Sequence, residues 1–200
     1  MTFENTLSLR IYPKNWYDIC YFKDFFKNPN YPLNIDIGSG KGRFIFGRSK
    51  NIPKENFLGI ERQLGRINKT SKKCYLDGRE NVNFIRIEAS YAIKYLVPPN
   101  YISNYYYFFP DPWPKDRHHH NRICNEDFLN SILKTLIPKG CFHIVTDHQG
   151  YFDEMFKIIN KNKKFNQINP FNPKENEMTD FELLFSNRKF FRCSFTKLED

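Results

Sequence analysis

The stretch that decides the fold reads Leu33-Asn34-Ile35-Asp36-Ile37-Gly38-Ser39-Gly40-Lys41-Gly42. Its first five residues predict a buried β-strand, and the glycines predict a tight turn into a helix, where the backbone can approach a nucleotide-like ligand closely. A dinucleotide fingerprint needs a third glycine where Arg43 stands, and a P-loop needs Ser or Thr where Gly42 stands. The pattern G-x-G-x-G, with Asp36 two residues before it, therefore predicts a cofactor site of a different class.

From Leu33 onward, short runs of β-branched or aromatic residues alternate with longer segments whose apolar residues recur at helical spacing. This alternation predicts an α/β protein, doubly wound, with a parallel sheet and helices on both faces. The five expected parallel strands are residues 33–37, 56–60, 82–87, 105–109 and 141–146. The expected helices between them are residues 43–50, 62–79 and 126–136, and Pro138, Lys139 and Gly140 are expected to end the last one.

The C-terminal part is expected to extend this sheet. Residues 151–160 are expected to form a helix and residues 165–168 a short strand. Thr179 with Glu182 three residues later predicts a brief capped helix over 179–186, and a last strand is expected over 190–196. These elements would complete a mostly parallel sheet of seven strands whose last strand is antiparallel. Residues 1–32 show no clear period, so we expect an N-terminal arm before a single domain, residues 33–200.

The composition limits the class of protein. Two hundred residues with 40% hydrophobic content suffice for one core without disulfides or structural metal. The five cysteines are widely spaced and form no C-x-x-C pair, so we expect reduced packing residues and no metal site. No apolar run approaches the roughly 20 residues of a membrane span, and Glu4 and Asn5 interrupt any N-terminal apolar segment, so we expect no membrane partner and a cytoplasmic location.

The formal net charge of +9 suits a polyanionic partner, because Lys and Arg release counterions when they neutralise phosphates. The chain is also rich in Asn, Lys, Ile, Phe and Tyr, a bias that a skewed genome composition produces without any selection for binding. The charge therefore leaves both explanations open.

Two further acids follow predicted strands. Glu61 ends the second strand, where a carboxylate can accept both hydroxyls of a ribose. Glu88, followed by Ala89, ends the third strand, where it could accept from an adenine amino group or simply cap the next segment. Because the carboxyl ends of neighbouring parallel strands converge, we expect Asp36, Glu61 and Glu88 to face a common crevice.

The most informative segment follows the fourth strand and reads Phe108-Phe109-Pro110-Asp111-Pro112-Trp113-Pro114-Lys115-Asp116-Arg117-His118. Its three prolines predict a stiff, extended loop that holds Asp111 and Trp113 over the crevice at low entropic cost. Lys115, Arg117 and, further on, Arg122 suit RNA phosphates, while Trp113 either stacks on a base or packs the loop. The consecutive histidines 118–120 point in different directions and are expected to bind no metal.

With these motifs the sequence resembles the tRNA (guanine-N7-)-methyltransferase family in its bacterial single-chain form, over about residues 33–197. The shared motifs are the glycine turn, Gly59-Ile60-Glu61, residues 110–115 with Arg117-His118, Thr146-Asp147 with Tyr151, and Thr179-Asp180-Phe181-Glu182. The resemblance implies a Rossmann-like class I methyltransferase fold, S-adenosylmethionine as the cofactor and transfer RNA as the partner. It further implies a monomer or homodimer without an obligate protein partner, and in-line transfer of the methyl group to N7 of the guanine at position 46, in the variable loop.

The resemblance also assigns residues. Asp111 is implied as the catalytic residue that orients the guanine, and no general base is required because N7 carries an in-plane lone pair. The implied cofactor residues are Asp36, Gly38, Gly40, Gly42, Glu61, Glu88, Ala89 and Asp111. The implied guanine-nucleotide residues are Lys115, Asp147, Thr179, Asp180, Phe181 and Glu182, with Arg117 and Arg122 as candidate RNA phosphate contacts.

Three positions depart from the family's pattern. Glu88 stands where Asp is usual, which lengthens the expected contact to adenine by one methylene. His120-Asn121 replaces two cations of a basic run, which bears on RNA affinity more than on the chemistry. Asn187-Arg188 replaces a glycine turn, which Asn can do because it tolerates a left-handed backbone.

Three other functions remain compatible with parts of the sequence. Methyltransferases of exocyclic base amines also use an acid-proline-aromatic loop after the fourth strand, which Asp111-Pro112-Trp113 partly matches. A catalytically silent RNA-binding domain of the same fold would not need intact Asp36, Glu61 and Asp111. A nicotinamide oxidoreductase shares the architecture, although Arg43 replaces its third glycine.

Overall fold

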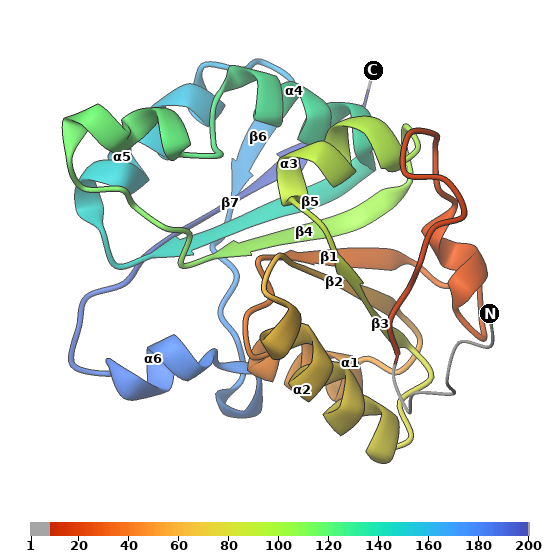
Figure 1. Cartoon of the computed structure of the whole chain (residues 1–200). Helices are drawn as coiled ribbons and strands as arrows, with labels where there is room; N and C mark the ends of the chain where they lie inside the picture. The colour runs from red at the N-terminus through yellow and green to blue at the C-terminus, as the bar shows by residue number, and fades with distance from the viewer. Residues whose placement is uncertain (1–8, 200) are drawn as a thin grey trace.

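The computed structural model describes residues 9–199, apart from the side chains of Asp116, His120 and Asn121 (Figure 1). Its centre is a seven-stranded sheet with the strand order β3-β2-β1-β4-β5-β7-β6. The strands are β1 (Leu33–Ile37), β2 (Asn56–Glu61), β3 (Val82–Arg86), β4 (Ile102–Phe108), β5 (Leu136–Thr146), β6 (Phe165–Ile168) and β7 (Phe191–Lys197). β1 to β5 pair in parallel, and β7 runs antiparallel to β5 and β6, which confirms the predicted doubly wound sheet with an antiparallel last strand.

The strand order reverses beside β1, and this reversal positions the site. The chain first winds outward from β1 to β2 and β3, and then returns to place β4 on the other side of β1. In open α/β sheets, such a reversal opens a crevice at the carboxyl ends of the strands, because the connections leave in opposite directions. The acids predicted to bind ligands follow these same strand ends.

Helices cover both faces of the sheet (Figure 1). Below the sheet in this view lie α1 (Arg43–Asn51), α2 (Leu64–Leu76) and α6 (Asp180–Leu184); above it lie α3 (Ala89–Tyr91), α4 (Glu126–Thr135) and α5 (Gln149–Asn160). Each face has its own apolar core. Phe44 of α1 and Ile67 of α2 pack in one core with Phe84, while Phe128 of α4 packs in the other with Phe142. The prediction of helices on both faces is confirmed.

The helix α4 illustrates how the sequence specifies these elements. It buries Phe128, Leu129 and Ile132, which recur at helical spacing, against the sheet. The side chain of Asn125 accepts a hydrogen bond from the Phe128 amide at 2.9 Å and so caps the first turn. The apolar face and the cap therefore agree on where the helix begins.

The predicted end of α4 is wrong. The helix ends at Thr135, and Leu136 already pairs with Ile102 as the first residue of β5, so Pro138, Lys139 and Gly140 lie inside a strand. The pairing shifts register between Ile102 and Asn104, and Lys139 has a φ of +63°. The break that Pro and Gly signal is therefore real, but it is an irregularity within the strand rather than a helix end.

Several short helical segments carry no signal in the sequence. α3 is followed by a π-helical turn, Ala92–Leu96, between β3 and β4, where no helix was predicted. The 3-10 helices Phe22–Phe25, Asp116–Asn121 and Glu175–Glu177 were not predicted either. Segments of three to six residues are too short to show a full helical period of apolar residues.

Residues 9–32 are the described part of the predicted arm, and the first three of them pair with the edge strand β3. The Phe84 amide donates to the Leu9 carbonyl at 2.8 Å, and the Ile11 amide donates to the Phe84 carbonyl at 2.7 Å. Ile11 and Phe22 are buried in the core. This segment therefore covers the open edge of the sheet. Residues 1–8 of the predicted arm lie outside the described part of the chain.

The cysteines bear on the prediction of reduced packing residues. The five cysteines are free thiols, and Cys141 alone among them is partly exposed. Burial raises the pKa of Cys74 to about 12, so this thiol stays protonated, as expected of a packing residue.

Within residues 9–199, no helix combines the length and apolar character needed to cross a membrane.

Candidate functional site

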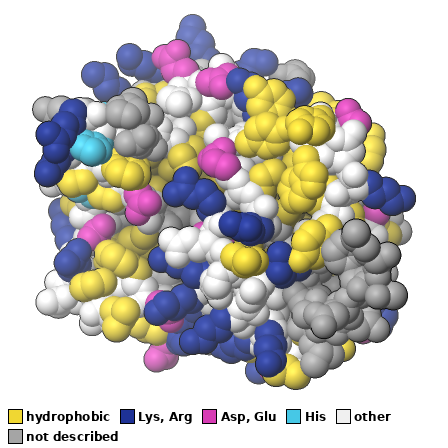
Figure 2. All heavy atoms as spheres, in the orientation of Figure 1, with side chains coloured by type: hydrophobic (Ala, Val, Ile, Leu, Met, Phe, Trp, Pro, Cys, Tyr) yellow, Lys and Arg dark blue, Asp and Glu magenta, His cyan; other side chains and the backbone are white. Residues whose placement is uncertain are grey.

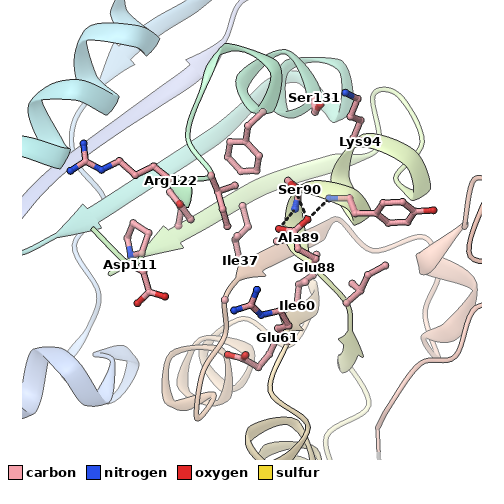
Figure 3. A pocket seen from close by; sticks show the side chains of 18 of the residues that line it. Ile37, Ile60, Glu61, Glu88, Ala89, Ser90, Lys94, Asp111, Arg122 and Ser131 are labelled. Carbon is pink, nitrogen blue, oxygen red and sulfur yellow. Dashed lines mark hydrogen bonds between the residues drawn. The ribbon is translucent and has the colours of Figure 1, made fainter. Parts of the chain in front are cut away.

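A cavity of about 700 Å³ lies at the carboxyl ends of β1 to β4 (Figure 3). Parallel pairing brings these strand ends together, because Asp36 of β1 is in register with Gly59 of β2 and Tyr106 of β4. The cavity gathers seven of the residues singled out in the sequence, namely Gly38, Glu61, Glu88, Ala89, Asp111, Trp113 and Arg122.

The three glycines of the turn have different roles, although all three have a left-handed backbone. A Cβ at Gly38, which lines the cavity, would meet no atom within 4 Å, so this glycine leaves space for a ligand. A Cβ at Gly42 would lie 2.0 Å from Cγ2 of Thr70, so Gly42 allows α1 and α2 to pack closely. Gly40 and Gly42 are not among the lining residues and instead shape the turn.

Glu61 is fixed by the backbone around it. Its carboxylate is buried, and it accepts hydrogen bonds from the Gly40 amide at 3.0 Å and from the Gln63 amide at 2.8 Å. The guanidinium of Arg66 lies 3.7 Å away. Because a carboxylate offers about four acceptor positions, Glu61 pins the glycine turn and still retains positions for ribose hydroxyls.

Glu88 caps α3 and also lines the cavity (Figure 3). Its carboxylate accepts from the Ser90 amide at 3.0 Å, from the Ser90 hydroxyl at 2.5 Å and from the Tyr91 amide at 2.8 Å. Three of its roughly four acceptor positions are therefore used, and one remains for a ligand amino group. The two interpretations that the sequence left open, a helix cap and a ligand contact, are compatible in this geometry.

Asp36 is not one of the residues that line the cavity, although its strand leads into it. Its side chain is only 5% exposed. Burial, followed by the nearby charge of Glu61, raises the pKa of Asp36 from 3.8 to about 8. The Asp36 carboxyl is therefore mostly protonated at neutral pH, so it serves the site as a neutral group rather than as a third carboxylate.

The loop after β4 brings Asp111 into the cavity wall (Figure 3). Phe109 and Trp113 have φ angles of +49° and +44°, which are rare for residues with a Cβ, so the loop follows a strained path. Arg122 braces this path, because its Nε donates to the Pro112 carbonyl at 2.8 Å and its guanidinium pairs with Glu154. Asp111 itself is exposed and has no hydrogen-bond partner within the described part of the chain.

The residues expected at RNA phosphates differ in their surroundings. Arg122 is buried and engaged with Pro112 and Glu154, which favours a bracing role over the expected phosphate contact. Lys115 and Arg117 are exposed and do not line the cavity. Trp113 lies parallel to the ring of His118, with centroids 5.9 Å apart, so the packing interpretation of Trp113 applies in this structure.

The residues expected at the guanine nucleotide form a second group, drawn from α6, from the end of β5 and, for Lys115, from the loop after β4. Thr179 Oγ accepts from the Glu182 amide at 3.1 Å, and Glu182 accepts from the Thr179 amide at 2.7 Å, which confirms the predicted capping box. Glu182 is buried and pairs with Arg192 at 2.5 Å. Asp147 pairs with Arg188 at 2.6 Å. Both carboxylates therefore have cationic partners within the chain.

Aromatic contacts join this second group to the Asp111 loop. The ring of Phe181 lies 4.6 Å from that of Phe109, which lines the cavity, and 4.6 Å from that of Phe185. None of the residues of the second group lines the cavity itself: Lys115, Asp147, Thr179, Asp180, Phe181 and Glu182. The structure thus brings five of the eight expected cofactor residues into the cavity lining, but not Asp36, Gly40 and Gly42. It places the expected guanine residues outside the cavity, where Phe181 contacts the lining residue Phe109.

Three parts of the cavity wall were not predicted, one of which is the start of α4 with Asn125, Asp127 and Ser131. Arg62 and Arg66 line it just after Glu61, where their position next to a ligand-binding acid was an available signal. Tyr91, Lys94 and Tyr95 line it from the helical segment after β3, whose brevity left no such signal. The cavity thus has hydrogen-bond acceptors at Glu61 and Glu88 for a nucleoside, and across from them the free acid Asp111.

The chain matches, over residues 30–190, a protein family described as putative methyltransferases. A tRNA (guanine-N(7)-)-methyltransferase from Streptococcus thermophilus is 32% identical over 168 residues, which cover 82% of this chain and 78% of that protein. A protein of the same name from Enterococcus faecalis is 32% identical over 164 residues, covering 80% and 76%. A third, from Buchnera aphidicola, is 36% identical over 142 residues, covering 71% and 59%.

Solved structures share the fold at low sequence identity. An rRNA methylase from Streptococcus thermophilus superposes with a TM-score of 0.57 and 15% identity, covering 90% of this chain and 93% of that chain. A SAM-dependent methyltransferase from Aquifex aeolicus superposes with a TM-score of 0.59 and 15% identity, covering 84% and 82%. These similarities show that the fold is that of methyltransferases, as the resemblance implied.

Proposed function

This chain belongs to the tRNA (guanine-N7-)-methyltransferase family, and we propose that it transfers the methyl group of S-adenosylmethionine to N7 of a guanine in transfer RNA, at position 46 of the variable loop. The observation that carries the proposal is the gathering of Gly38, Glu61, Glu88 and Asp111 around one cavity. The first three offer space and acceptors for a nucleoside cofactor, and the fourth is an acid free to contact a second reactant.

The residues of the cavity fit S-adenosylmethionine, which supplies a methyl group on a positively charged sulfur when bound. Glu61 retains acceptor positions for the ribose hydroxyls, and Glu88 retains one for the adenine amino group. The open space at Gly38 allows close approach to the backbone, and Ala89 adds a small apolar surface. Asp36, Gly40 and Gly42 support the turn behind these contacts. The volume of about 700 Å³ is ample for a ligand of this size.

Asp111 is the residue we assign to the reacting base. Guanine N7 carries an in-plane lone pair, so it can accept the methyl group without first losing a proton, and the chain needs no general base. What the chain must supply is orientation, an effect that can contribute roughly 7–11 kcal/mol. The free carboxylate of Asp111, on a braced loop, can hold the guanine in line and stabilise positive charge as it develops on the purine.

The second group of residues is proposed to select guanine. Asp147 and Glu182 could accept hydrogen bonds from N1 and from the amino group of guanine. Adenine does not offer this pair of donors. Both carboxylates are paired in this structure, Asp147 with Arg188 and Glu182 with Arg192. Each would therefore have to accept hydrogen bonds from guanine while it remains paired with its arginine. Lys115, Thr179, Asp180 and Phe181 would surround the same nucleotide. A guanine held in folded RNA must leave its stack to reach this place.

The cellular setting of the reaction also remains a proposal. Transfer RNA is the partner, no other protein is needed for the site, and the protein acts in the cytoplasm as a monomer or homodimer. The positive charge of +9 is in keeping with a polyanionic substrate.

The test uses the purified protein, labelled S-adenosylmethionine and two unmodified transfer RNA transcripts that differ at one base. One transcript carries guanine at position 46, and its matched control carries adenine there. We expect 7-methylguanosine from the first transcript and no product from the second, measured by mass spectrometry of the digested nucleosides.

Two of the alternative functions have their own signatures in this assay. Methylation of an exocyclic amine, seen as N2-methylguanosine or N6-methyladenosine, would replace the proposal by the nearest rival chemistry. Binding of S-adenosylmethionine and transfer RNA without any methylated product would support a catalytically silent RNA-binding domain. Equal methylation of both transcripts would refute the assignment of position 46 and leave the reaction type standing.

A further inference from the structure

A stripe of cations runs along the solvent face of α2. The helix contains four cations and no acid: Arg66, Lys69, Lys72 and Lys73. On the opposite side of the helix, Ile67, Thr70, Ser71 and Cys74 are buried. At 3.6 residues per turn, the four cations occupy an arc of about 120° directed away from this buried side. Figure 2 shows Lys and Arg side chains gathered in the lower part of the molecule, over α1 and α2.

The cations of this stripe have few acidic neighbours. Lys69 and Lys72 are exposed and pair with no acid in the described part of the chain. Lys73 lies over the ring of Phe46 at 4.0 Å, and the nearest acid to Arg66 is Glu61, at 3.7 Å, which is itself buried. Within the described structure, ion pairing therefore leaves most of the charge of the stripe uncompensated, and Lys69 and Lys72 have no acidic partner.

This arrangement is unfavourable for the helix by itself. Lys69 lies three residues from both Arg66 and Lys72 and four from Lys73, and like charges at these spacings repel one another on a helix surface. Arg66 also lies in the first turn, next to the positive end of the helix dipole. A polyanion bound along this face would relieve both repulsions.

The stripe begins at the mouth of the candidate site. Arg66 lines the cavity, as does Arg62 just before the helix. From Arg66 to Lys73 the helix rises about 10 Å, a length over which an RNA duplex presents several phosphates. A nucleic acid that places one base in the cavity thus has its backbone within reach of this helix.

We infer that the stripe on α2 binds the phosphate backbone of the transfer RNA that delivers the guanine, an inference that rests on the proposed function. The continuity of the stripe with the cavity favours this occupant over an anionic membrane surface, because the same molecule must enter the cavity and contact Arg66. The stripe contributes affinity and orientation, while Asp111 and its neighbours contact the base.

The experiment compares two double variants of the full chain. In Lys69→Gln with Lys72→Gln, two cations are removed from the stripe, away from the cavity. In the matched control, Lys157→Gln with Lys161→Gln, two exposed cations are removed at α5, above the sheet in Figure 1. Dissociation constants for transfer RNA are measured by filter binding between roughly 50 and 200 mM salt.

We expect the stripe variant to bind transfer RNA on the order of tenfold more weakly at about 0.15 M salt, and its slope of log affinity against log salt to be shallower by about two. The control variant should match the wild type in both. Affinity for S-adenosylmethionine, measured by calorimetry, should be equal in all three proteins, which excludes a misfolded site as the cause.

The inference is overturned if the stripe variant keeps the wild-type salt slope, or if the control variant loses as much slope as the stripe variant. It is also overturned if the stripe variant loses binding to phosphatidylserine vesicles while its affinity for transfer RNA is unchanged. The proposed function is judged separately, by whether the wild-type protein forms 7-methylguanosine. A wild type that forms this product alongside a stripe variant with unchanged RNA affinity would refute only the role of α2.

Discussion

The acids on the two sides of the cavity are used in different ways. Glu61 and Glu88 accept hydrogen bonds from backbone amides beside them, and so they shape the glycine turn and cap α3. Asp111 has no partner in the described structure and is held only by its loop, which Arg122 braces. Acids bonded to their own backbone therefore set the geometry of the site and keep only part of their acceptor capacity for a ligand, whereas an acid left free is available to the reacting base.

The largest effect is expected at the free acid. In Asp111→Ala, the single-turnover rate of methylation should fall on the order of 10²- to 10³-fold, because a preorganised group that stabilises developing charge is lost. Affinity for S-adenosylmethionine should change by only a few fold, as Glu61 and Glu88 remain in place. Rapid-quench kinetics measure the rate, and calorimetry measures the affinity.

The control for this variant is Asp153→Ala, which removes an exposed acid of α5 and should leave the rate unchanged. A wild-type rate in Asp111→Ala would remove Asp111 from the chemistry. A folded Asp111→Ala protein with no measurable cofactor binding would instead show that Asp111 shapes the cofactor site, as Glu61 and Glu88 do.

The next effect is expected at Glu61. In Glu61→Gln, the amide can accept from only one of the two backbone donors, Gly40 or Gln63, and the other is left unsatisfied. We expect the free energy of unfolding to fall by about 1–3 kcal/mol and cofactor affinity to weaken with it. Urea unfolding measures the first quantity, with Glu126→Gln, at an exposed position of α4, as the matched control. Unchanged stability would show that Glu61 does not hold the turn.

A smaller effect is expected at Glu88, which caps a short helical segment. Glu88→Ala should lower the free energy of unfolding by about 1 kcal/mol, because the amides of Ser90 and Tyr91 lose their acceptor. Glu88→Asp should restore most of this loss, since aspartate is a good helix cap. If Asp restores stability but not cofactor affinity, the length of the Glu side chain serves the ligand; if it restores neither, the capping role is refuted.

The last effect concerns the protonation of Asp36 and is seen as a dependence of stability on pH. Its pKa is raised from 3.8 to about 8 in the folded chain, so between these values the folded state holds a proton that the unfolded state has lost. The Asp36 contribution to stability is therefore present in full below about pH 4, declines as pH rises, and is lost once pH has passed through about 8. In Asp36→Asn this dependence disappears. The melting temperature of the variant minus that of the wild type should therefore increase from pH 5 to pH 8. A difference that stays constant across this range would show that Asp36 ionises normally.

Local patterns predicted the site unevenly. The glycine turn and Glu61 could be found because they stand at the ends of recognisable strands, and Asp111 because three prolines mark the loop after the fourth strand. The role of Arg122 could not be found, because its partners Pro112 and Glu154 lie 10 and 32 positions away and only the fold brings them together. Pro138 and Gly140 predict the end of a helix at residues 136–140, but the pairing of Leu136 with Ile102 overrides this local signal and makes the segment a strand.

The sequence by itself determined the parallel sheet, the glycine turn and the family motifs, because these depend on residues that are neighbours in the chain and on their alternation. Only the tertiary structure decided that Asp36 is buried and protonated, and that Asp147 and Glu182 are paired with arginines. The physical reason is that burial, desolvation and ion pairing depend on which distant segments meet, and that meeting is set by packing across the sheet rather than by any local pattern.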